Sequence, residues 1–90
     1  MTKRGKLEIR RDILELVRDN RNSIKPTPLL RKSQLSSKIF QNYLAELIEK
    51  GLIQEIPNKN GETFISLTEK GFKFLERYKV IVDFIEEFEL

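Results

Sequence analysis

Apolar residues recur at helical spacing in two segments near the start of the chain. Residues 6–20 alternate apolar side chains with charges, a pattern typical of an amphipathic helix of about four turns. The polar stretch that follows ends this helix. Thr27 before Pro28 then predicts a short second helix ending near Ser33, because proline in the first helical position loses only an amide that has no partner.

A third helix is predicted between two caps, Ser36 and Gly51. The Ser36 hydroxyl can accept a hydrogen bond from an unpaired amide of the first turn, and glycine suits the left-handed position beyond a helix end. One side of this helix is expected to pack, through Phe40, Tyr43, Leu44, Leu47 and Ile48, whereas the other presents Ser37, Lys38, Gln41, Asn42 and Ala45. Two helices joined by the tight turn at Gln34 and Leu35 predict a helix-turn-helix.

The strand-like segments follow the third helix. Residues 52–56 and 62–67 read as two strands of a hairpin, and the loop between them ends in Asn60-Gly61, which favours positive φ angles. We interpret this loop as a wing. Its one cation, Lys59, is a candidate for contact with phosphate or a minor groove, and the alternative is a simple solvated turn.

The last segment predicts a long helix with an apolar seam. Thr68 is its expected N-cap, and the helix is expected to continue to Leu90. Such a helix would be about 33 Å long, whereas the preceding 67 residues would form a body roughly 28 Å across. The overhang favours burial in a second copy, although the helix could instead fold back on its own domain. The predicted dimer contacts are Phe74, Tyr78, Ile81, Val82, Ile85 and Phe88.

Composition limits the chemistry. The chain has no cysteine and no histidine, which excludes disulfides, thiolate nucleophiles and the usual zinc ligand sets. No glycine-rich phosphate loop or carboxylate pair suggests an enzyme, and we expect no cofactor or metal and see no sign of a small-molecule ligand. The longest apolar run is Val80-Ile81-Val82, so neither a membrane span nor an export signal is expected. A cytoplasmic, nucleoid-associated protein is predicted.

Charge is distributed unevenly along the chain. Residues 1–44 contain eleven basic and four acidic side chains, a net +7, whereas residues 45–90 contain six basic and ten acidic ones, a net −4. A polyanion such as double-stranded DNA would be attracted to the first half and repelled by the second. The alternative is that these cations only solvate the surface. The basic candidates for DNA contact outside the third helix and the wing are Lys3, Arg4, Lys6, Arg31 and Lys32.

The polar side of the third helix carries the chemistry used to read DNA. It combines a cation, Lys38, with two amides, Gln41 and Asn42, and a small residue, Ala45, and these groups are used to read base edges and phosphates in a major groove. An ordinary solvated helix face would have a similar composition.

The order of helix, helix, helix, hairpin and helix resembles a winged helix. The string YLAELIEKGLIQE, followed by NGETFISLTEKGFKFLERY, is similar to small archaeal winged-helix DNA-binding proteins of about ten kilodaltons, and the likeness begins at KRGKLEIRRDILELV. The resemblance implies an α+β, mostly α fold: a winged helix-turn-helix at residues 1–67 and a C-terminal dimerisation helix at 68–90, which in that family forms an antiparallel coiled coil. It also implies DNA contact by Ser36, Ser37, Lys38, Gln41, Asn42 and Lys59.

One departure affects the expected dimer. The final helix is short and strongly apolar for that family, so the dimer could be a compact packing of helix ends instead of a long coiled coil.

Three functions remain open from the sequence. The first is a dimeric transcriptional regulator that reads a defined site, and the second is an architectural, nucleoid-associated protein with little sequence preference. The third is a protein-interaction module, because a fold does not determine a function.

Overall fold

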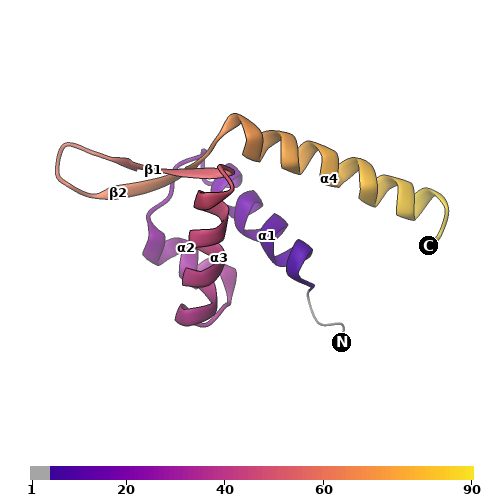
Figure 1. Ribbon diagram of the computed structural model, residues 1–90, viewed down its shortest axis with the longest axis horizontal. Coiled ribbons are helices and arrows are strands. Elements are labelled where there is room, and N and C mark those ends of the chain that lie inside the picture. Colours follow the sequence, from indigo (N-terminus) through magenta and orange to yellow (C-terminus); the bar gives the residue numbers. More distant parts are fainter. Residues whose placement is uncertain (1–4) are drawn as a thin grey trace.

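Helices α1–α3 pack together on one side of a β-hairpin in the computed structural model, which describes residues 5–90. The elements are α1 (Lys6–Asp19), α2 (Pro26–Ser33), α3 (Ser37–Glu49), β1 (Ile53–Pro57), β2 (Thr63–Leu67) and α4 (Glu69–Glu87). The hairpin and α4 extend in opposite directions from the helical body (Figure 1). The predicted fold class, mostly α with a two-stranded hairpin, is confirmed.

The core collects the apolar stripes of all these elements. Phe40 of α3 is fully buried, as are Ile13 and Leu14 of α1 and Ile65 of β2. Tyr43 and Ile48, predicted to pack, are only partly buried at the edge of the core. Burying an aliphatic or aromatic side chain contributes about 1.5–3 kcal/mol, so α3 is held on the body mainly by its apolar stripe. Its polar side is left facing solvent.

The turn between α2 and α3 is held by serine hydroxyls and by an unusual backbone. Ser33 Oγ donates to the Leu30 carbonyl at 2.7 Å and accepts from the Leu35 amide at 3.3 Å. Gln34 takes a left-handed conformation with φ of 60°. The predicted start of α2 at Pro28 was wrong, because Pro26 occupies the first turn and the helix begins there. Pro28 is tolerated since amides of the first turn have no partner within the helix.

The hairpin is antiparallel, with Ile53 opposite Leu67 and Pro57 opposite Thr63. The predicted strand limits were shifted by about one residue. Gly61 takes the expected positive φ of 80°, whereas Asn60 does not have a positive φ. Ile24 extends the sheet on the other side of β2: its amide donates to the Ile65 carbonyl at 3.1 Å and its carbonyl accepts from the Ile65 amide at 2.7 Å.

Helix α4 begins against the body and then leaves it. Thr68 is the N-cap, as predicted, and its hydroxyl accepts from the Gly71 amide at 3.1 Å. Leu75 is buried, but the later turns extend past the body along the 50 Å axis of the molecule (Figure 1). The expected overhang is therefore present. The predicted helix end at Leu90 was wrong, since α4 ends at Glu87 and Glu89 has a positive φ of 54°.

Candidate nucleic-acid interface

The exposed side of α3 brings together the predicted base-reading residues. The Ser36 hydroxyl accepts the Ile39 amide at 3.3 Å, which fixes the first turn of the helix and confirms the predicted N-cap. Lys38, Gln41 and Asn42 are exposed on the following two turns, and so is Ser37. Within residues 5–90, the side chains of Lys38 and Gln41 form no hydrogen bond or ion pair, so both are available to a ligand.

An ion pair from α1 supports the flank of α3. The Arg10 guanidinium donates from Nε and Nη2 to the two carboxylate oxygens of Glu46, the second contact being 3.1 Å, and it lies 5.8 Å from the centre of the Tyr43 ring. The hydrogen bond from Arg10 lowers the pKa of Glu46 below its ordinary value of 4.5. Because Arg10 is neutralised within the protein, it is a poor candidate for phosphate binding.

The Arg10–Glu46 pair predicts an acid-sensitive contribution to stability. Because the folded state lowers the pKa of Glu46, this contribution is complete above pH 4.5, the ordinary value, and is lost as pH falls through the lower pKa of the folded protein. We expect Glu46→Gln to lower the thermal midpoint at neutral pH, with a difference from wild type that shrinks below pH 4.5. Thermal unfolding followed by circular dichroism across this range measures it.

Glu49→Gln is the matched control, since Glu49 is an exposed carboxylate on the same helix. It should reproduce the pH dependence of the wild type. A Glu46→Gln difference that stays constant from neutral to acid pH would contradict a charge-based contribution.

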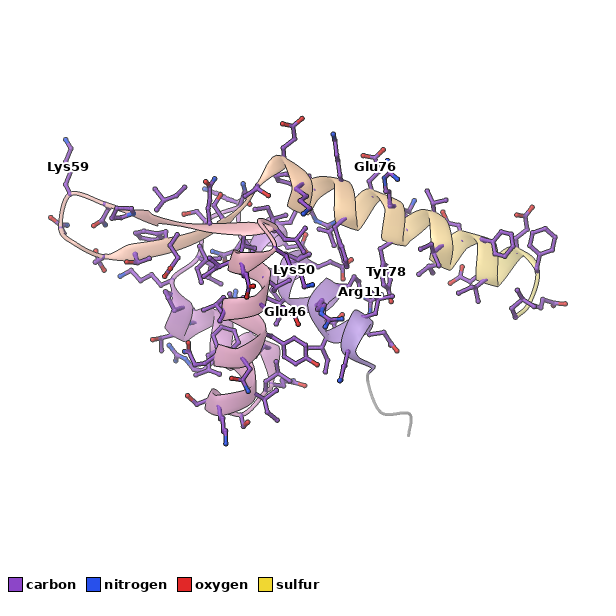
Figure 2. All side chains as sticks on the ribbon, in the orientation of Figure 1. Arg11, Glu46, Lys50, Lys59, Glu76 and Tyr78 are labelled. Carbon is purple, nitrogen blue, oxygen red and sulfur yellow. The ribbon has the colours of Figure 1, made fainter. Side chains whose placement is uncertain are left out.

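The wing is tethered to the body beside its turn, at Glu62, and carries a lysine at its tip. Lys25 pairs with Glu62 and lies 5.8 Å from the centre of the Phe64 ring. Asn58 Oδ1 accepts the amides of residues 60 and 62, each at 2.9 Å, which closes the turn. The hydrogen bond from Lys25 lowers the pKa of Glu62. Lys59 projects from the tip, away from the helical body (Figure 2).

The remaining basic candidates within residues 5–90 lie on two different helices. Lys6 is exposed at the start of α1, beside α3, whereas Arg31 and Lys32 are exposed at the end of α2. Lys3 and Arg4 lie outside the described residues.

Two residues near this surface were missed from the sequence. Lys25 holds the wing through a partner 37 positions away, a pairing that no local pattern predicts. Ile39 lies exposed beside Asn42. The sequence does predict its exposure, because the helical spacing of Phe40, Leu44 and Leu47 places Ile39 outside the packed stripe.

The predicted dimer seam divides between two environments. Phe74 and Tyr78 are partly buried, and Arg11 of α1 lies 4.9 Å from the centre of the Tyr78 ring, facing it between the two helices (Figure 2). Val82 lines an open groove of about 490 Å³ between α1 and α4. From residue 80 onward most of the apolar side chains are exposed. They are Val80, Ile81, Phe84, Ile85, Phe88 and Leu90, of which Val80, Phe84 and Leu90 were not in the predicted set.

Neither a metal site nor a membrane span is visible in the described part of the chain. No group of three potential metal ligands occurs among residues 5–90. None of the helices there is both long enough and apolar enough to cross a bilayer.

Comparisons with known proteins identify the fold. The profile of the family described as winged helix-turn-helix matches residues 3–86. Sso10a-2, a DNA-binding protein from Sulfolobus solfataricus, is similar with a TM-score of 0.75 and 22% identity, over 96% of this chain and 86% of its own length. F93 from STIV, a winged-helix DNA-binding protein, gives 0.72 and 20%, over 89% and 91%. No curated protein matches the chain.

A larger protein shares the same fold. MepR, a transcription regulator of the Staphylococcus aureus multidrug efflux pump MepA, has a TM-score of 0.77 and 21% identity over 88% of this chain. This chain spans 59% of the length of MepR.

Proposed function

The chain belongs to the winged helix-turn-helix family, and on that premise we propose that it is a dimeric DNA-binding protein that reads a defined site and regulates transcription. The observation that carries the proposal is the exposed side of α3, where Lys38, Gln41 and Asn42 stand together on a helix held rigidly by its buried stripe. Two amides and a cation are the groups that read base edges in a major groove. We expect no catalytic activity and a location with the chromosome in the cytoplasm.

Charge and shape support contact with double-stranded DNA. Within residues 5–90, Arg31 and Lys32 of α2 and Lys38 of α3 are exposed and form no ion pair, so the two helices of the helix-turn-helix keep positive charge that can attract a polyanion. Lys59 adds a second, separate cation at the end of the wing. Sso10a-2 and F93 are described as DNA-binding proteins, and MepR as a transcription regulator.

The second part of the proposal is that α4 forms the dimer. Its outer half exposes large apolar side chains on several sides, with 55% of Phe84 and 57% of Phe88 open to solvent. We assign this surface to contact with a second copy of the chain. The exposed acids beside it suit the solvated rim of a protein interface and would repel DNA; they are Asp83, Glu86 and Glu87. In this assignment Ile81, Ile85 and Phe88 meet the partner, whereas Phe74 and Tyr78 connect the dimer helix to the body.

The amides of α3 provide the test for sequence reading. Replacing Gln41 or Asn42 with alanine should weaken binding to the preferred site by about 1–3 kcal/mol and leave binding to random DNA nearly unchanged, because base contacts discriminate and phosphate contacts do not. Titration of each variant against both DNAs, by fluorescence anisotropy, measures the two losses separately.

A matched alanine variant at exposed Gln54 of β1 should change neither affinity. Equal losses on preferred and random DNA for Gln41→Ala and Asn42→Ala would instead favour an architectural protein with little sequence preference.

A further inference from the structure

Ile39 is an exposed apolar side chain in the first turn of α3. Some 47% of the residue is open to solvent, and it does not pack against the core. Its amide is held at 3.3 Å by the Ser36 hydroxyl, so the position is fixed by the helix cap. Two of its neighbours on the helix are exposed and polar, namely Lys38 before it and Asn42 one turn later, and Tyr43 lines the same hollow.

The exposed half of Ile39 adds nothing to folding. A β-branched side chain loses rotamer freedom in a helix, and its exposed apolar area gains nothing from burial in the body. The same stiffness is an advantage in recognition, because little further freedom is lost on contact. The side chain is therefore better explained by what approaches α3 from outside.

Ile39 and Asn42 form a pair on the surface of α3. Residues three apart on a helix have Cβ atoms about 5–6 Å apart, and both side chains line the same shallow hollow beside Lys6 and Arg10 of α1. An amide and a branched apolar side chain thus face outward together. Arg10 is already paired with Glu46, so the charge that remains at the edge of this hollow is that of Lys6.

The pair matches the major-groove edge of an A·T base pair. An asparagine amide binds N6 and N7 of adenine, and an apolar side chain packs on the C5-methyl group that thymine alone carries among the four bases. The next step rests on the proposed function, in which α3 enters the major groove. We infer that Ile39 contacts a thymine methyl next to an adenine bound by Asn42. The preferred site would then contain an A·T pair in each half-site, and removal of that methyl would weaken binding.

The test uses two DNA duplexes that differ only in the methyl group. Duplexes of equal length with alternating dA and dT, or alternating dA and dU, are titrated with the wild-type protein at low salt. We expect the thymine duplex to bind about fourfold more tightly per half-site, the factor that corresponds to about one methyl group removed from water. Ile39→Ser should bind both duplexes equally, and Ile39→Val should keep most of the preference.

Ile56→Ser is the matched control, because Ile56 is 45% exposed but lies on the wing. It should leave the ratio of the two affinities unchanged. Equal binding of both duplexes by the wild type would overturn the methyl contact while leaving DNA binding intact. A preference that survives in Ile39→Ser would also overturn the assignment, since another residue would then read the methyl. Failure to bind either duplex would instead refute the proposed function itself.

Discussion

Replacing Ile85 with lysine is expected to convert the protein from a dimer to a monomer. Ile85 lies on the exposed outer half of α4, within the surface that we assign to the partner subunit. A lysine there would bury a charge among apolar side chains without a partner, which is costly. Sedimentation velocity at micromolar concentration should show the change in mass.

The loss of the dimer should also appear in DNA binding. Linked subunits gain from effective concentration, so affinity for DNA with two half-sites should fall by about 10²–10⁴-fold, whereas affinity for one half-site should hardly change. Glu87→Lys is the control: it changes the charge more, but on the polar side of the same helix, and should remain dimeric. A wild-type protein that sediments as a monomer would contradict the assignment of α4.

Gly71→Ala should destabilise the fold strongly, against the usual helix preference. At an exposed position inside a helix, replacing glycine with alanine stabilises the folded state by about 1 kcal/mol. Here a Cβ at Gly71 would lie 2.2 Å from the backbone carbonyl oxygen of Leu52, so α4 would have to move away from the start of β1. Overpacking of this kind costs about 1–3 kcal/mol or more, and we expect a net loss of about 2 kcal/mol in the free energy of unfolding. Urea denaturation measures it.

Gly5→Ala is the matched control for the Gly71 variant. A Cβ at Gly5 would meet its nearest neighbour, Glu8 Oε1, at an ordinary 3.6 Å. The change removes only a glycine at a helix N-cap and should alter stability by less than about 1 kcal/mol. A Gly71→Ala protein as stable as the wild type would show that α4 is not packed as closely as described.

The close approach of Gly71 to Leu52 also explains part of the string that resembles the winged-helix family. In the Leu-Thr-Glu-Lys-Gly segment, Thr68 Oγ1 donates to the Gly51 carbonyl at 2.6 Å and accepts from the Gly71 amide, while the Thr68 amide donates to Leu52 at 3.1 Å. The threonine begins α4, and the glycine lets that helix touch the start of the hairpin. The family-like string therefore specifies how α4 leaves the body.

Local patterns in the sequence were sufficient for most elements. The apolar stripe and the Ser36 cap of α3 depend on residues within a few positions of one another, and so do the Thr68 cap and the loop that ends in Gly61. Interactions of this kind can be read from spacing alone. The fold and the outward side of α3 followed from them.

Contacts between distant segments could not be predicted in this way. The bridge between Ile24 and Ile65 joins residues that lie far apart in the sequence, and no local spacing indicates it. The charge count of residues 1–44 includes Arg10 as a free cation. In the structure Glu46, 36 positions later, neutralises it. The positive charge available at α1 is therefore smaller than its number of basic residues suggests, because Arg11 is also engaged, by Asp12 and by the ring of Tyr78.

DNA binding itself is tested by titrating the wild-type protein against random DNA and against a site selected from genomic fragments, at several salt concentrations. We predict that both DNAs bind at low salt and that affinity falls as salt rises, with a slope of about −0.9 for each phosphate contacted. The selected site should bind more tightly by about 10³-fold or more. Absence of binding to either DNA at low salt would contradict the account.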